Sequence, residues 1–167
     1  KKEITYTYVQ GIKEGTTTAL VGTITENGKE TAYTYDGRGN ILEICTKELD
    51  TGKVTDHMLY TYTGMNQVIR EEDAVRGRTF TYAYDLGGNL LENKKYDQVN
   101  GVEELRGTDT YTYSSGWKDQ LTSFNGKAIT YDAMGNPLSY MGMNLTWEKG
   151  RQLKTLKKSG TLSQYVY

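Results

Sequence analysis

The sequence has very little proline, cysteine and histidine, and each scarcity excludes something. One Pro in 167 residues leaves β-strands largely uninterrupted. The single Cys45 excludes an internal disulfide framework and is uninformative about the compartment. Because His57 is the only histidine, any catalytic triad or zinc site would have to be built around one imidazole. We therefore expect no catalytic residues, no enzyme activity and no cofactor.

Long apolar runs and a charge bias are missing as well. The sequence contains no run of the ~18 apolar residues that a membrane helix needs. The 20 Lys and Arg residues nearly balance the 21 Asp and Glu residues, which gives a net charge of −1. A nucleic-acid binder would carry a basic stripe instead. We expect no nucleic-acid partner and no membrane span in this segment.

Tyrosine and glycine are abundant, with 15 Tyr and 19 Gly. Tyrosine suits half-buried strands, and Tyr-Thr-Tyr alternation with period two predicts them. In each such strand we expect the rings on one face of the sheet and the threonines on the other. The dipeptides Asn27–Gly28, Asn100–Gly101 and Asn125–Gly126 favour type I′ hairpin turns. Residues 102–106 are compatible with one helical turn. The predicted fold class is all-β, an array of antiparallel β-hairpins.

A motif of the form Tyr-Asp-x-x-Gly-Asn recurs in phase along the chain. The full copies are Tyr35, Asp36, Gly39, Asn40; Tyr84, Asp85, Gly88, Asn89; and Tyr131, Asp132, Gly135, Asn136. Three further copies have Thr63, Ser114 or Glu148 in place of the Asp. A repeat of this length buries its apolar face only by stacking on its neighbours. We predict one array of about seven hairpin units over residues 1–167. Because the chain opens on Lys-Lys-Glu and stops within a repeat, we expect it to be a piece of a longer protein.

This motif resembles the YD repeat, also called the RHS repeat, of bacterial Rhs and wall-associated proteins, toxin-complex BC components and animal teneurins. The resemblance implies one curved, spiralling sheet that belongs to a hollow shell. It also implies a structural role in a bacterial secreted or cell-surface protein, with the rest of the shell and an enclosed C-terminal domain, often a toxin, as partners. The Asp-Pro-x-Gly motif that closes the array in that family does not occur in this sequence. The resemblance therefore implies a segment of shell wall.

The Asp of each motif is expected to be structural. An Asp that enters a tight turn accepts hydrogen bonds from backbone N–H groups two residues on, and the Gly supplies a positive φ. One carboxylate per loop is too few for calcium. We therefore expect Gly39, Gly88 and Gly135 to have positive φ, and no metal site.

The alternative function is a cell-surface carbohydrate-binding module. Gly116–Trp117 and residues 125–135 faintly resemble the Gly-Trp and Asn-Gly-Lys repeats of bacterial cell-wall and clostridial toxin binding modules. In those modules Gly-Trp occurs in nearly every repeat, whereas here it occurs once. The candidate residues for stacking on a polysaccharide are Trp117, Trp147 and Tyr140. In either case the free sheet edges of such an array predict edge-mediated self-association.

Overall fold

The computed structural model describes residues 3–167, which form sixteen strands and no helix. The first eight strands are β1 (Ile4–Gln10), β2 (Thr17–Glu26), β3 (Lys29–Tyr35), β4 (Ile41–Glu48), β5 (Val54–Tyr62), β6 (Val68–Asp73), β7 (Arg78–Tyr84) and β8 (Leu90–Val99). The others are β9 (Val102–Tyr113), β10 (Leu121–Phe124), β11 (Lys127–Ala128), β12 (Thr130–Tyr131), β13 (Pro137–Tyr140), β14 (Met143–Glu148), β15 (Gln152–Lys158) and β16 (Thr161–Gln164). The predicted all-β class is confirmed. With no helix, these residues contain none that could cross a membrane.

Strands that follow one another in the chain are neighbours in the sheets. An eleven-stranded sheet has the order β1 to β11, and a five-stranded sheet has the order β12 to β16. The hydrogen-bonded ladder is interrupted at Ile129, whose amide donates to the Thr122 carbonyl at 2.8 Å. Ile129 is also the one buried hydrophobic residue among those that the structure describes, with 7% exposure.

The predicted helical turn at 102–106 is wrong, because these residues begin β9. Asn100 and Gly101 have φ of 52° and 80°, which is the two-residue turn that joins paired strands directly. Strand pairing therefore starts at Val102 and leaves no residues for a helical turn. Asn27–Gly28 and Asn125–Gly126 also have two positive φ values, as predicted.

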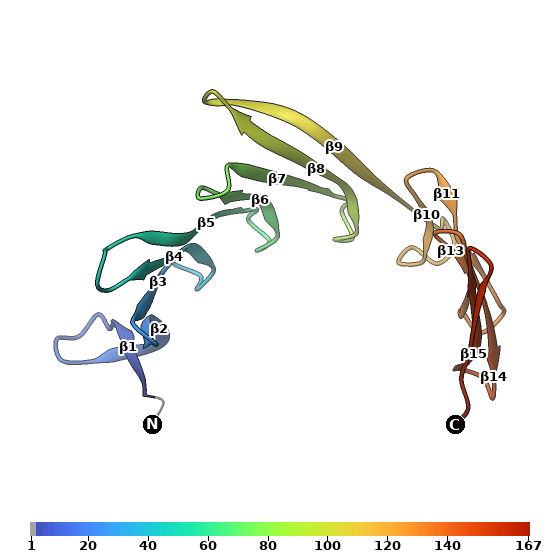
Figure 1. The fold of residues 1–167 in the computed structure, drawn as a ribbon, viewed down its shortest axis with the longest axis horizontal. Helices are drawn as coiled ribbons and strands as arrows, with labels where there is room; N and C mark the ends of the chain where they lie inside the picture. The colour runs from blue at the N-terminus through green and yellow to red at the C-terminus, as the bar shows by residue number, and fades with distance from the viewer. Residues whose placement is uncertain (1–2) are drawn as a thin grey trace. The chain divides into compact units, whose positions relative to one another are not determined.

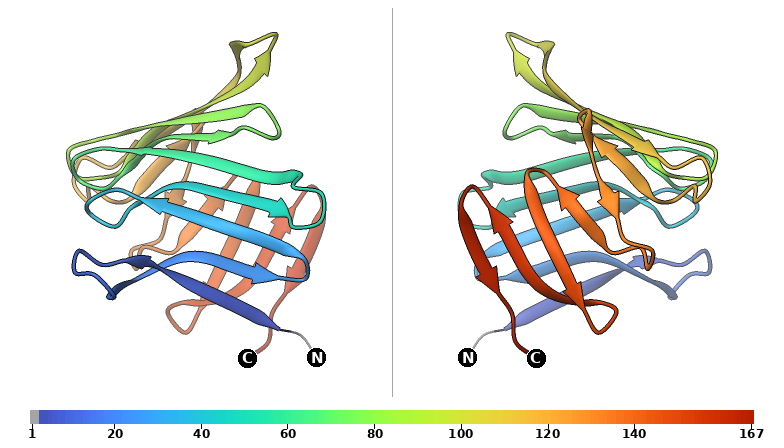
Figure 2. Two further views of the ribbon diagram at one scale, coloured as in Figure 1. Left: turned by 90° about the vertical axis from the view of Figure 1, so that its left-hand side faces the viewer. Right: turned by 90° about the vertical axis from the view of Figure 1, so that its right-hand side faces the viewer.

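Two compact units make up the fold. The first runs up to Tyr82 and includes 94–107; the second comprises 83–93 and 108–167. In each unit the strands form a single layer (Figure 1). The left view of Figure 2 shows the blue to green strands of the first unit side by side in chain order. Neither face of such a layer is packed under a second layer, which explains why most strand residues are only half-buried.

The two faces of the first unit differ in chemistry. On one, the aromatic face, the strand register aligns Tyr33 with Ile44 and Ile44 with Met58. This face carries Tyr6, Ile24, Tyr33, Ile44, Met58, Tyr60 and Phe80, and also the polar residues Thr31, Thr46 and Glu71. The opposite, polar face carries Thr7, Thr23, Thr34, Glu43, Cys45, His57, Leu59, Arg70, Glu72 and Thr79. The predicted separation holds for the aromatic residues named here, which share one face, but threonine and charged residues occur on both faces.

The second unit shows the same separation in its last strands. Leu145 lies opposite Leu156 and Trp147 opposite Leu153, whereas Thr146 lies opposite Thr155. The two threonine hydroxyls are 2.6 Å apart. Cross-strand pairs of this kind contribute ~0.2–1 kcal/mol each. Because few side chains are fully buried, such pairs and the backbone ladder supply much of the stabilisation.

A cluster of polar side chains ties β9 to β6 and β7 on the polar face. The Glu103 carboxylate accepts hydrogen bonds from both terminal nitrogens of Arg70 and from the Thr79 hydroxyl at 2.9 Å. Gln98 Nε2 donates to it at 3.1 Å, and Arg70 Nε donates to Glu72 at 2.6 Å. Thr79 is 1% exposed, so its contact with Glu103 is shielded from water. The guanidinium of Arg70 holds the pKa of Glu103 below its usual value.

Candidate functional site

The most regular chemistry of the chain lies in the turns of the repeat motif. In the first full copy, Asp36 Oδ1 accepts hydrogen bonds from the amides of Arg38 at 2.8 Å and Asn40 at 2.9 Å. Its Oδ2 accepts the Asn40 side-chain amide at 2.8 Å. Asp85 and Asp132 make the same three contacts at 2.8 to 2.9 Å. Each carboxylate is therefore used by its own turn.

The motif glycines have the backbone conformation that this turn requires. Gly39, Gly88 and Gly135 have φ of 86°, 90° and 81°, which confirms the predicted positive values. Their amides donate to the carbonyls of Asp36, Asp85 and Asp132, at 3.1, 3.1 and 3.0 Å respectively. A residue with a Cβ is strained in this region, so glycine closes the turn without steric strain.

Two degenerate copies use a hydroxyl in place of the carboxylate. Thr63 Oγ1 accepts the amides of Met65 and Gln67, both at 3.2 Å, and Asn66 adopts φ of 62° where the full motif has glycine. Ser114 Oγ accepts the amides of Gly116 and Trp117 at 3.3 and 3.2 Å. One oxygen with two lone pairs suffices for the two amides. The turn therefore persists at Thr63, whose amide donates to the Gln67 carbonyl as Asp36 does to Asn40. At Ser114 the loop is longer, since the Ser114 amide donates to the Gln120 carbonyl, and the Glu148 copy turns at Lys149 and Gly150.

The local hydrogen bonds also set the charge state of the turns. The Asn40 side-chain amide holds the pKa of Asp36 below its ordinary value. Asn89 and Asn136 lower the pKa of Asp85 and Asp132 in the same way. Among residues 3–167, no three His, Cys, Asp or Glu side chains gather in a way that would hold a metal ion.

Acid should therefore destabilise the chain, and the three motif aspartates should contribute to the effect. Each has a lower pKa in the folded than in the unfolded state, so the unfolded chain binds more protons as the pH drops. The stabilisation that these aspartates contribute is fully present above about pH 4, which is their pKa in the unfolded chain. It is lost as the pH falls through their lower pKa values in the folded state. The melting temperature, measured from pH 7 to pH 2, should fall in that window. A triple Asp36→Asn, Asp85→Asn, Asp132→Asn chain should show a shallower acid decline, and an unchanged decline would contradict this assignment.

The motif Asn also connects successive turns. Asn40 Nδ2 donates to Asn66 Oδ1 at 2.9 Å, and Asn136 Nδ2 donates to the Gly150 carbonyl at 2.7 Å. Asn89 reaches the Lys118 carbonyl at 3.3 Å. One amide group thus serves both its own Asp and the next turn. We did not predict this contact; its signal is the Asn directly after the Gly in all three full copies.

A second contact joins five of the repeats to the one before. The Tyr62 hydroxyl donates to the Ile41 carbonyl at 2.7 Å, and the Trp147 indole donates to the Pro137 carbonyl at 2.8 Å. Three other residues do the same: Tyr35 to Val21, Tyr113 to Leu90 and Tyr131 to Leu121, at 2.9, 3.0 and 2.6 Å. We call these five side chains the anchor aromatics. In four of the five cases the acceptor is the first residue after the preceding turn, so the contact keeps the same place in the repeat.

The strand pairing is irregular next to these anchor aromatics. A register shift immediately precedes Tyr35, Tyr62, Tyr131 and Trp147. A bulge of this kind re-aims the side chain beside it. Partial burial of the ring raises the pKa of Tyr62, Tyr113 and Tyr131. The neutral phenol, which is the donor form, is therefore favoured.

Removing one anchor hydroxyl should measurably weaken the array. Tyr62→Phe leaves the Ile41 carbonyl without its side-chain donor, and we expect the free energy of unfolding to fall by about 1 kcal/mol. The matched control is Tyr33→Phe, because no hydrogen bond of the Tyr33 hydroxyl is present among the described residues. Urea titration followed by tyrosine fluorescence measures both. Equal losses in the two variants would show that the anchor hydrogen bond contributes nothing.

The three candidate sugar-stacking residues have different surroundings. Trp117 is 60% exposed, and the tip of its ring lies against the turn at Gly135. Trp147 is half-buried and donates to Pro137, and Tyr140 is half-buried at the end of β13. No ring contact joins any two of these three residues in the part of the chain described. The structure therefore leaves Trp117 as the exposed aromatic of the set.

Cys45 and His57 lie directly opposite each other on β4 and β5. His57 Nε2 is 2.7 Å from Glu43 Oε1. The imidazole thus has a carboxylate partner on the polar face.

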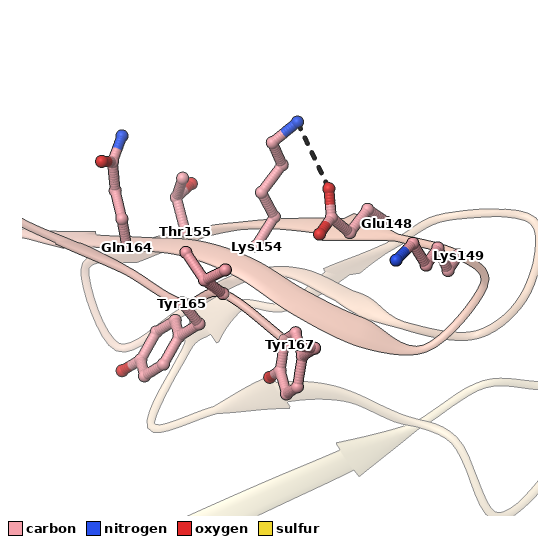
Figure 3. A pocket seen from close by; sticks show the side chains of 8 residues that line it. Glu148, Lys149, Lys154, Thr155, Gln164, Tyr165 and Tyr167 are labelled. Atoms are coloured by element: carbon pink, nitrogen blue, oxygen red, sulfur yellow. Dashed lines mark ion pairs between the residues drawn. The ribbon is translucent and has the colours of Figure 1, made fainter.

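The surface is hollowed where the chain leaves β16. An open groove of about 430 Å³ is lined there by Glu148, Lys149, Lys154, Thr155, Gln164, Tyr165, Val166 and Tyr167. Figure 3 shows Tyr165 and Tyr167 on one side of the strand, with Lys154 and Glu148 on the other. Lys154 Nζ and Glu148 Oε2 form an ion pair at 3.4 Å. The polar groups point away from the two rings. The side chains that line the groove therefore do not point toward a common place where they could hold a ligand.

Comparison with known proteins gives a structural likeness only. No protein-family model matches the chain, and no curated protein does. Among solved structures, the chain is similar to one described as TcdB2-TccC3-Cdc42, with a TM-score of 0.57 and 18% identity over 82% of this chain and 9% of that chain. It is also similar to TcdB2-TccC3-TEV, with a TM-score of 0.54 and 16% identity over 98% of this chain and 10% of that chain. The chain thus spans about a tenth of the length of these chains, and it shares their fold over that stretch.

Proposed function

We propose that this chain is a structural, non-enzymatic segment of a YD/RHS-repeat shell, which encloses or displays a C-terminal domain of a bacterial secreted or surface protein. The observation that carries the proposal is the anchor hydrogen bond, which recurs from repeat to repeat. In four of the five contacts it joins a hairpin to the first residue after the preceding turn, although the loops between hairpins vary in length. A wall made of one chain needs such a repeated side-to-side contact. The shared fold with TcdB2-TccC3 chains supports this proposal.

The single-layer construction supports it as well. Side chains on both faces of the first unit remain half-exposed, so neither face is buried in a hydrophobic core within that unit. A sheet with two available faces can line an enclosure on one side and face solvent on the other. The polar face carries paired charges such as Lys47 with Glu30, at 2.9 Å, which keeps that face hydrated.

Protease protection tests the proposal in the longer protein that we expect to contain this chain. Its C-terminal domain should resist digestion while the array is intact and become sensitive when Gly135→Val disrupts a turn. The matched control is Gly37→Ala, since Gly37 has open space around it and Ala133 occupies the equivalent position of the third full motif. A C-terminal domain that is digested equally fast with and without the intact array would refute an enclosing role.

The alternative, carbohydrate binding, is favoured by the exposed ring of Trp117. Under the shell proposal, titration with wall polysaccharide or oligosaccharides should leave tryptophan fluorescence unchanged. A saturable change that disappears in Trp117→Ala and persists in Trp147→Phe would establish a sugar site instead. Both variants carry one tryptophan, so their signals are directly comparable.

A further inference from the structure

The hairpin of β8 and β9 has a free backbone edge in the interior of the chain. β9 has twelve residues, but the four-residue β10 pairs only with residues 111–113. Asn125 ends this pairing, because its amide donates to the Thr110 carbonyl at 2.9 Å and its side-chain oxygen accepts the Thr110 amide at 2.7 Å. Within residues 3–167, the stretch 102–108 (yellow in Figure 1) therefore has a strand neighbour on the β8 side only. Both flanking strands, β8 and β10, belong to this chain, so the edge does not depend on residues outside it.

The backbone groups of every second residue point to this edge. The two-residue turn of the hairpin places Gln98 opposite Glu103. The Gln98 amide donates to the Gly77 carbonyl at 2.7 Å, on the side away from β9, so Gln98 and Glu103 form a non-hydrogen-bonded pair. The N–H and C=O groups of Glu103, and by alternation those of Leu105 and Gly107, therefore point away from β8. They are available to an added antiparallel strand.

The edge is already ordered on its β7 side. The Glu103 carboxylate accepts hydrogen bonds from Arg70 and from the Thr79 hydroxyl, which fixes the start of β9 against its neighbours. A partner strand therefore meets a fixed edge, and association costs less conformational entropy than it would with a flexible segment.

One charge of each sign lies on this edge, on either side of Leu105. Glu104, Leu105 and Arg106 are all exposed. The hairpin turn places Glu104 opposite Asp97 of β8, and like charges that face each other across a ladder are destabilising. Arg106 lies 3.9 Å from Asp97, whereas Glu104 forms no ion pair within the part of the chain that the structure describes. A cation on the free side of Glu104 would therefore be stabilising.

We propose that residues 102–108 pair with the same residues of a second copy of the chain, antiparallel and about a two-fold axis through Leu105. In this register Glu104 lies opposite the partner's Arg106, and Arg106 lies opposite the partner's Glu104. Leu105, which is 56% exposed, faces the partner's Leu105. Glu103 faces the partner's Gly107, which has no side chain and so leaves the contacts of Glu103 undisturbed.

The charges select this register over its neighbours. Because the backbone groups of Leu105 point to the edge, Leu105 forms the hydrogen-bonded pair on the axis. Glu104 and Arg106 then form non-hydrogen-bonded pairs, in which Cα atoms are only ~4.5 Å apart. An axis through Glu104 or Arg106 would instead place two like charges opposite each other. Charged residues commonly protect a free edge from pairing, and here they leave one register open.

The length of the edge fits this register as well. The free stretch begins at Val102, after the hairpin turn, and ends before Thr110, where Asn125 takes over the pairing. With the axis at Leu105, Val102 meets the partner's Thr108, so the two stretches cover each other from end to end. Val102 is 62% exposed in the single chain and is partly covered in the dimer.

Sedimentation velocity over a concentration series tests the proposal on the 167-residue chain. The unaltered chain should form a discrete dimer. Glu104→Arg places arginines opposite each other in both charged pairs, and we expect the dissociation constant to rise roughly tenfold or more. Arg106→Glu should weaken the dimer in the same way, through facing glutamates. Glu14→Arg makes an equal change of net charge in an exposed loop and should leave dimerisation intact. Circular dichroism verifies that the variants remain folded.

Charge exchange separates this contact from a general loss of charge. In an equimolar mixture of Glu104→Arg and Arg106→Glu chains, every arginine of one chain faces a glutamate of the other. The mixture should therefore form a heterodimer about as stable as the unaltered dimer. A chain that carries both changes should dimerise with itself for the same reason. Restored association in these two samples also shows that neither substitution acts by unfolding the hairpin.

Cysteine cross-linking tests the register in a Cys45→Ser background. Leu105→Cys should oxidise to a covalent dimer, because a residue on the axis faces itself at ~5.5 Å between Cα atoms, which suits a disulfide. Val102→Cys alone should not cross-link, whereas a mixture of Val102→Cys and Thr108→Cys chains should.

Three results would overturn the proposal. The first is a chain that stays monomeric over the whole concentration series. The second is a dimer that Glu104→Arg does not weaken, or one that the mixture of the two charge variants does not restore. The third is a dimer in which Leu105→Cys fails to cross-link. None of these outcomes bears on the shell function proposed above, which depends on contacts within one chain.

Discussion

Glu103→Ala will lower the free energy of unfolding of the chain by about 2 kcal/mol. The change leaves the Arg70 guanidinium and the almost fully buried Thr79 hydroxyl without their common acceptor. Leaving a buried donor unsatisfied costs ~1–3 kcal/mol, and the partial exposure of Arg70, at 32% of its side chain, keeps the value within that range. Urea unfolding followed by circular dichroism measures the loss.

Two companion variants distinguish this cluster from a general loss of charge. Glu104→Ala removes an exposed carboxylate from the same strand, next to Glu103, and should change stability by less than ~0.5 kcal/mol. Glu103→Gln retains an oxygen that accepts from Thr79 but lacks the charge that pairs with Arg70, so its effect should be intermediate. If Glu103→Ala and Glu104→Ala unfold at the same urea concentration, the cluster does not stabilise the fold.

Gly135→Val will cost at least about 2 kcal/mol, more than the same change at Gly39. Both glycines have positive φ, where a β-branched residue is strained by ~1–2 kcal/mol. At Gly135 a Cβ would also meet Trp117 Cζ3 at 3.2 Å, whereas at Gly39 it would meet nothing within 4 Å. The excess of the Gly135 effect over the Gly39 effect therefore measures the contact with Trp117.

A double-mutant cycle isolates that contact. In a Trp117→Ala background, the additional cost of Gly135→Val should fall to the value found for Gly39→Val, because only the backbone strain remains. The fluorescence of Trp117 should also shift in the single Gly135→Val variant, since the ring has to move. An unchanged spectrum together with equal costs at the two glycines would contradict the assigned turn geometry.

The local features of the fold were predictable from the sequence. Asn-Gly pairs and the Asp-x-x-Gly-Asn turns depend on φ preferences and on hydrogen bonds between residues close in the chain, and these are properties of residue type. The division into two faces followed from the period-two alternation of side chains along strands such as β3. The positive φ of Gly88 belongs to this predictable class.

The contacts between repeats were not predictable in the same way. The anchor of Tyr62 bonds a backbone carbonyl, and a carbonyl leaves no trace in the residue type that bears it. Glu103 finds Arg70 at a separation of 33 residues, in a stretch whose sequence was compatible with a helical turn. Only the register of the intervening strands brings these groups together. Such register depends on turn lengths that no single motif encodes.

The carbonyl acceptors of the anchor aromatics have a consequence for how such a chain can change over generations. The residues that supply them include Ile41, Leu90, Leu121 and even Pro137, since every residue type has a main-chain oxygen. A mutation at the acceptor position therefore leaves the link in place. A hairpin that is duplicated, deleted or moved within the gene meets a compatible neighbour at once, without a second, compensating mutation. Arrays of this type can lengthen or shorten by recombination alone.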